Sequence, residues 1–129
     1  MRALLVAALV VSLVSPAIAK GGWACRNTIE VNCSTTSCAA SGDFTPMDIH
    51  LNPKSGAIDV CAYTGCWTGK AKVSRRAGFT VFTASRLPFK SGDQPASSKS
   101  SIAITIDTRD GVGVIKVDSF AQPVNCVKD

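Results

Sequence analysis

The chain has 129 residues, six cysteines and a formal net charge of +5. This length allows one domain with a modest hydrophobic core. No apolar run after residue 19 approaches the roughly 20 residues that a membrane-spanning helix needs, so we expect no transmembrane segment there. The composition therefore favours a small globular protein.

The N-terminus has the pattern of a secretory signal peptide. Met1 and Arg2 give a positive start, residues 3–14 are apolar, and Ala17-Ile18-Ala19 fits a small-residue cleavage site. We predict that residues 1–19 are removed and that residues 20–129 form one domain. The mature protein would be periplasmic or secreted. We expect no lipid anchor at Cys25, because no aliphatic residue stands three positions before it.

Alternation of apolar and polar residues predicts several strands and no helix after the signal peptide. The predicted strands cover residues 23–31, 47–52, 58–63, 67–73, 79–86, 102–107 and 112–120. The alternation breaks at residues 81–82 and 114–115, which indicates bulges. Residues 32–38 and 90–101 are predicted loops, and Pro123 is expected to end the last strand.

Strands separated by short turns are typical of a single small antiparallel barrel or sandwich built of hairpins. We therefore predict an all-β fold, stapled by disulfides. Residues 49–56 also align with residues 104–111 at an offset of 55. Such a match fits an internal duplication, but it also fits the general likeness of two amphipathic hairpins.

An even number of cysteines in an exported chain favours disulfides. Of the 15 pairings that six cysteines allow, we prefer Cys25–Cys126, Cys33–Cys38 and Cys61–Cys66. Parity places the last pair on the outer face, at the feet of a Thr-Gly turn. The alternative is a zinc site made of the two x4-spaced pairs, which the oxidising context and the wide spacing disfavour. We predict no metal and no cofactor.

Candidate catalytic residues are few. His50, the single histidine, lies two residues from Asp48 on the same face of a predicted strand. A general base with an orienting carboxylate uses these residue types, but it also needs a nucleophile or a substrate pocket. No nucleophile elbow or phosphate-binding loop is present. We predict no enzyme, and a small hydrolase using His50 and Asp48 is an alternative.

One segment carries nearly all of the net charge. Residues 67–92 contain six cations and no acid, namely Lys70, Lys72, Arg75, Arg76, Arg86 and Lys90. These residues predict a basic hairpin face for an anionic partner, such as a phosphorylated lipid headgroup, an acidic glycan or an acidic protein. The other interpretation is that the cations only keep an exposed hairpin soluble and block edge pairing. Nucleic acid is the least favoured partner, because stacking aromatics are lacking.

Tyr63 is predicted to face outward on its turn, as a contact residue beside this face. Taken together, the sequence predicts an exported binding module of unknown ligand that is associated with the cell envelope or inhibitor-like. A structural envelope component without a discrete ligand is the other alternative. The layout of a small secreted barrel with cysteines near both ends resembles bacterial lysozyme inhibitors of the membrane-bound or periplasmic C-type group. The loop motif of that group is not matched, because residues 41–44 are one residue too short.

Overall fold

The computed structural model describes residues 21–129, so the predicted signal peptide lies outside the described residues. Residues 21–129 form eleven strands and no helix. The strands are β1 (Trp23–Arg26), β2 (Glu30–Cys33), β3 (Cys38–Ser41), β4 (Met47–Leu51), β5 (Ala57–Ala62), β6 (Gly65–Lys70), β7 (Lys72–Arg76), β8 (Phe79–Lys90), β9 (Ser98–Asp107), β10 (Val112–Val117) and β11 (Phe120–Lys128).

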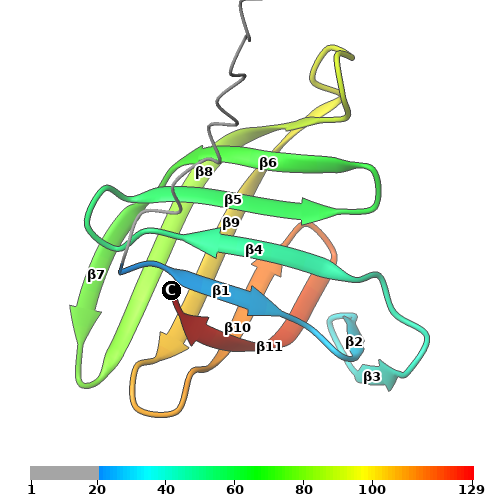
Figure 1. The fold of residues 1–129 in the computed structure, drawn as a ribbon. Coiled ribbons are helices and arrows are strands. Elements are labelled where there is room, and N and C mark those ends of the chain that lie inside the picture. The colour runs from blue at the N-terminus through cyan, green and yellow to red at the C-terminus, as the bar shows by residue number, and fades with distance from the viewer. Residues whose placement is uncertain (1–20) are drawn as a thin grey trace, which may run out of the picture.

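Eight of the strands close an antiparallel barrel in the order β1, β4, β5, β6, β8, β9, β10, β11 (Figure 1). Pairing of β1 with both β4 and β11 completes the circle. The other strands are additions. β7 follows β6 after one residue and pairs with the first part of β8, and the β2–β3 hairpin attaches to β11 near Phe120. The all-β prediction is confirmed, and the architecture is a barrel.

Apolar side chains that alternate with outward residues along each strand fill the barrel interior. Ile49, Val60, Ile104 and Ile115 are completely buried. Trp67 packs beside Phe89, with ring centroids 4.6 Å apart. Side chains normally fill a barrel of this strand number, and larger barrels are the ones that enclose channels. The outer surface is therefore the place to look for a site.

All three predicted disulfides are present, and each joins residues directly opposite one another in adjacent antiparallel strands. Cys25–Cys126 links β1 to β11, where the barrel closes. Three disulfides are consistent with an extracellular or periplasmic environment. Residues 21–129 contain no helix that is long and apolar enough to cross a membrane.

The barrel contains two halves that repeat each other at a constant offset of 55 residues. The first half is β4–β6 and the second half is β9–β11. The registers of both hairpins agree in the two halves: Met47–Ala62 matches Ile102–Val117, and Ala57–Lys70 matches Val112–Asn125. The weak similarity of residues 49–56 and 104–111 therefore marks a structural repeat of three strands.

The turns of the two halves repeat as well. Gly56 and Gly111 have φ angles of 74° and 77°. Their carbonyls accept hydrogen bonds of 2.8 Å from the amides of Ala71 and Cys126, which are again 55 residues apart. A Cβ would lie 2.6 Å from the Ala71 oxygen at Gly56 and 2.2 Å from the Cys126 oxygen at Gly111. Both positions therefore require glycine.

The two predicted bulges are wrong. β8 and β9 keep their register through Val81, and β10 and β11 keep theirs through Val114. Both valines simply point outward, which broke the apparent alternation. The real bulge lies between Ala84 and Leu87 of β8, where the register with β9 shifts.

Other boundaries also differ from the prediction. The predicted strand 67–73 is split between β6 and β7, and the predicted strand 112–120 is split between β10 and β11. β8 continues to Lys90 and pairs with a β9 that begins at Ser98, so the loop is shorter than residues 90–101. Pro123 lies within β11 and is paired with β10 on one side. On the other side, pairing with β1 starts only at Asn125, so the N–H that proline lacks is not needed for pairing there. The predicted strand 23–31 is split between β1 and β2, and the predicted loop 32–38 is the tip of the β2–β3 hairpin.

Candidate anion-binding face

Strand alternation places a group of cations on the outer face of β6, β7 and β8. Trp67 is buried in β6, whereas Lys70 is exposed. In β7, Lys72 and Arg76 are exposed opposite Thr83 and Phe79 of β8. The sequence-predicted residues Lys70, Lys72 and Arg76 therefore share one surface.

Arg86 occupies the bulge of β8 and has a φ angle of 58°. A left-handed conformation is uncommon for a bulky residue and marks a strained position. Leu87, the next residue, is buried and faces Gly69 of β6, because a Cβ at Gly69 would lie 2.6 Å from Leu87 Cδ2. Lys70 follows Gly69 in β6, and Arg86 precedes Leu87 in β8. Both cations therefore lie on the outer face of the barrel, where β6 adjoins β8.

Two further members of the face come from the ends of β8 and β9. Lys90 is exposed opposite Cys66 of β6. Lys99 is exposed in β9 opposite Pro88. Lys99 is not among the sequence-predicted residues, because it lies in the polar run 90–101, which has the pattern of a loop. We call the six cations Lys70, Lys72, Arg76, Arg86, Lys90 and Lys99 the basic face.

The cations of the basic face have no acidic partner among residues 21–129. The ion pairs of this range join Arg26 to Asp48 and Arg109 to Asp107, and His50 lies within 3.6 Å of Asp48. The nearby Asp59 accepts a 2.6 Å hydrogen bond from Thr68 Oγ1 instead. The basic face is thus free to attract a mobile anion.

Arg75 does not belong to this face. It pairs with the buried Thr80 of β8 and so lies on the opposite side of β7 from Arg76. Its Nη2 donates a 3.2 Å hydrogen bond to the carbonyl of Pro53, in the β4–β5 turn. The prediction of one patch that includes both arginines needs this correction, since adjacent residues of a strand face opposite ways.

Tyr63 is 73% exposed at the β5–β6 turn, with a φ angle of 56°. Its ring lies 6.2 Å from that of Phe120, at the end of the barrel that carries the β10–β11 turn. Tyr63 also lines a hollow that includes Phe44, Met47 and Asp48. The structure therefore places Tyr63 beside this hollow, apart from Lys72 and Arg76 on β7.

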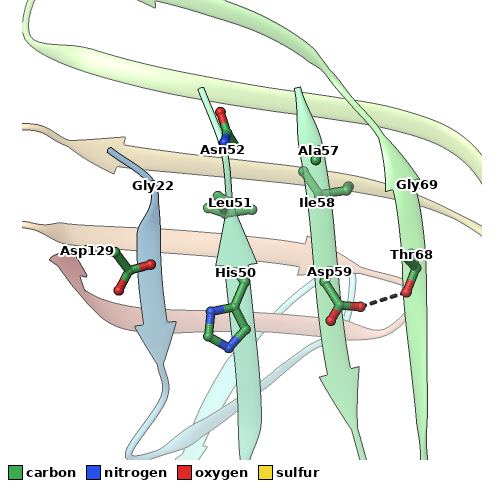
Figure 2. Close-up of a pocket in the computed structure, with 10 residues that line it drawn as sticks. All are labelled: Gly22, His50, Leu51, Asn52, Ala57, Ile58, Asp59, Thr68, Gly69 and Asp129. Atoms are coloured by element: carbon green, nitrogen blue, oxygen red, sulfur yellow. Dashed lines mark hydrogen bonds between the residues drawn. The ribbon is translucent and has the colours of Figure 1, made fainter. Parts of the chain in front are cut away.

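His50 and Asp48 share the outer face of β4, with 3.6 Å between Nε2 and Oδ2. An open hollow lies beside His50, as a hydrolase would require (Figure 2). The hydroxyl in this hollow belongs to Thr68, which donates to Asp59 on the intervening strand β5. His50 and Thr68 are therefore separated by a whole strand and do not form a nucleophile–base pair.

The sulfurs of Cys61 and Cys66 lie close to the carboxylate of Asp59. The two sulfurs are bonded to each other, so they do not act as thiolate ligands. Comparisons of the whole chain with known proteins find no matching family model, no similar curated protein and no similar solved structure.

Proposed function

We propose that this protein is an exported binding module whose basic face holds an anionic partner. The carrying observation is that six cations from four adjacent strands point outward without an ion pair among the described residues. Such a cluster attracts anions and speeds their association, and salt weakens the attraction.

Arg86 adds a second, independent argument. Its left-handed backbone places a bulky residue where glycine would be less strained. Strained residues persist where the surrounding structure enforces them, and they cluster at binding and catalytic sites. We infer that the side chain of Arg86 takes part in binding at the basic face.

Retention on a phosphocellulose column, eluted with a salt gradient, tests this function. We expect Arg86→Glu and Lys70→Glu to elute at clearly lower salt than the unchanged protein. Arg75→Glu is the matched control, because it changes the net charge equally on the opposite side of β7. Equal elution of Arg75→Glu and Arg86→Glu would show that retention reflects net charge alone and would overturn the proposal.

Arg86→Gly separates binding from stability. The free energy of unfolding should stay unchanged or rise by up to about 1 kcal/mol, because glycine relieves the left-handed strain but loses more entropy on folding. Column retention should nevertheless fall. A large loss of stability with normal retention would mean that Arg86 has a structural role only.

The two alternatives have less support. A hydrolase using His50 and Asp48 has the hollow it needs, but Thr68 in that hollow is bound to Asp59. A structural envelope component without a ligand explains the cations only as protection of the exposed β7 edge, and it leaves the strain at Arg86 unexplained. Binding of an anionic partner accounts for both the cations and the strained backbone of Arg86.

A further inference from the structure

A row of outward-facing residues without charge crosses the barrel next to the basic face. Its members pair successively across β7 to β11, as Ser74, Val81, Thr105, Val114 and Pro123. The next outward positions on β8 and β10 are Phe79 and Val112. Val112 and Val114 are 51% and 53% exposed, and Phe79 is 39% exposed. We call Phe79, Val81, Val112, Val114 and Pro123 the apolar face.

The fold does not require two members of this face, Val114 and Pro123, to be apolar. The positions 55 residues earlier have the same backbone pairing and carry polar residues. Asp59 occupies the position of Val114, and Thr68 occupies that of Pro123. Since a polar residue is accommodated at the equivalent position of the first half, the exposed Val114, beside the exposed Val112, points to a contact surface.

Cations flank the apolar face on two sides. Arg76 and Lys72 lie on β7, and Arg76 is opposite Phe79. Lys116 is exposed on β10, two residues from Val114, and its Nζ contacts the carbonyl of Asp118.

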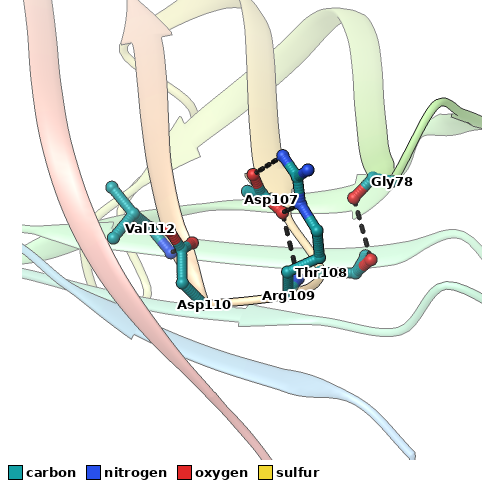
Figure 3. A network of polar contacts seen from close by, with 6 residues as sticks. All are labelled: Gly78, Asp107, Thr108, Arg109, Asp110 and Val112. Atoms are coloured by element: carbon teal, nitrogen blue, oxygen red, sulfur yellow. Dashed lines mark hydrogen bonds and ion pairs between the residues drawn. The ribbon is translucent and has the colours of Figure 1, made fainter.

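Arg109, near Val112, does not add a free charge to this surface. Its guanidinium is held by the carboxylate of Asp107 (Figure 3). The free positive charge beside the apolar face therefore comes from β7 and Lys116, and one negative charge comes from Asp110, whose Oδ1 accepts the amide of Val112.

The apolar face together with the cations beside it limits the kind of partner that this surface could bind. A second copy would bring like charges together, which disfavours self-association through this face. Both described hollows lie on the β4–β5 side of the barrel, and neither includes a residue of the apolar face. Protein contacts rely on aromatic or arginine anchors seated in pockets. Phe79 and Arg76 line neither of the described hollows, so this face suits a fluid surface better.

We propose that the apolar face and the neighbouring cations bind the surface of a bilayer that contains anionic phospholipids. The valines would enter the boundary between headgroups and acyl chains, and the lysines and arginines would contact the phosphates. This inference rests on the proposed function, because it names the class of anionic partner. It adds a second requirement, the apolar contact, that a soluble polyanion does not have.

Sedimentation with lipid vesicles tests the inference. The protein is used without residues 1–19, since the closed barrel lies within residues 21–129. We expect binding to vesicles of phosphatidylglycerol and phosphatidylcholine, and none to phosphatidylcholine alone. Replacing Lys72 or Arg76 by Gln should weaken vesicle binding by about fivefold each. Replacing Val112 or Val114 by Ser should weaken it by about threefold each.

The controls separate this inference from the proposed function. Val114→Ser should leave phosphocellulose retention unchanged, and Ile29→Ser, an exposed apolar residue before β2, should leave vesicle binding unchanged. Normal retention without vesicle binding would overturn the lipid inference and leave the proposed function standing. Loss of both would overturn both. A dimer in analytical ultracentrifugation that Val114→Ser dissociates would assign the apolar face to self-association instead.

Discussion

The two halves of the barrel, β4–β6 and β9–β11, have the same register and carry different outer surfaces. Where the first half exposes Asp48, His50, Asp59 and Thr68, the equivalent positions of the second half are Ala103, Thr105, Val114 and Pro123. The interior differs too, because buried Trp67 stands at the position of buried Gln122. Turn glycines and inward residues thus fix the barrel, and the outer residues of each half are free to specialise.

The two halves are joined through β1 on one side of the barrel and through β8 on the other. The largest expected change in stability concerns these two junctions. Cys25–Cys126 cross-links the β1–β11 seam and closes a loop of 101 residues, whereas no disulfide joins β6 to β8 among the described residues. Replacing both cysteines by Ala should lower the free energy of unfolding by about 4–5 kcal/mol. Urea denaturation measures this change. A loss below about 1 kcal/mol would mean that strand pairing alone closes the barrel.

The turn glycines test whether the halves are equivalent in energy as well as in shape. Gly56→Ala and Gly111→Ala should each cost about 3 kcal/mol or more, because a Cβ meets a carbonyl oxygen and the φ angle is positive. Gly92→Ala is the control: its φ angle is also positive, but it has no atom within 4 Å, so only about 1–2 kcal/mol is expected. A cost at Gly111 like that at Gly92 would break the equivalence.

The Cys61–Cys66 disulfide is present in one half only. Lys116 and Ala121 occupy its equivalent positions and are also directly opposite one another. Transplanting them, as Cys61→Lys with Cys66→Ala, should cost about 2 kcal/mol from the lost short-loop cross-link. The variant should still fold, which a far-ultraviolet circular dichroism spectrum can confirm. Failure to fold would show that the first half depends on the Cys61–Cys66 disulfide.

The smallest expected effect is a pH dependence confined to the second half. Asn52 and Asp107 are equivalent, and the side-chain oxygen of each accepts the amide two residues later. The Arg109 side chain, which donates to the carboxylate, lowers the pKa of Asp107 to about 2 from its usual 3.8. Because the folded-state pKa is lowered, the stabilisation is complete above pH 3.8 and is lost as pH falls through about 2.

A carboxyl titration by nuclear magnetic resonance checks this effect. Arg109→Gln should return the pKa of Asp107 toward its usual value. Asp107→Asn should keep the turn, as Asn52 does, and remove this part of the acid sensitivity. An unchanged Asp107 pKa in Arg109→Gln would contradict the assignment.

The sequence was sufficient for the all-β fold, because inward residues such as Ile58 and Val60 alternate cleanly. The three disulfides present are the preferred set, but the sequence alone did not exclude the other pairings. The sequence pattern gave wrong predictions where apolar residues point outward. Val81 and Val114 were read as bulges on the assumption that valine faces the core, and these same residues form the apolar face. The real bulge could not be predicted, because Arg86 carries no glycine or proline signal for a left-handed backbone.

The candidate site was only partly predictable for the same reason. Charge counting found Lys70, Lys72 and Arg76, but strand direction separates Arg75 from them. Lys99 joins the basic face only through pairing of β8 with β9 across a loop. Contacts between distant segments of the chain are set by the closed sheet, and residue patterns along one strand do not report them.

The seam between β6 and β8 has a kinetic consequence. Only two residue pairs join these strands, against four plus a disulfide between β1 and β11. Transient breathing of the barrel should therefore begin at β6–β8, where amide hydrogens should exchange fastest with solvent. Lys70 and Arg86 lie on either side of this seam. An anion that bridges them would hold β6 and β8 together reversibly. Slower hydrogen exchange of these amides in the presence of the anion would show this effect.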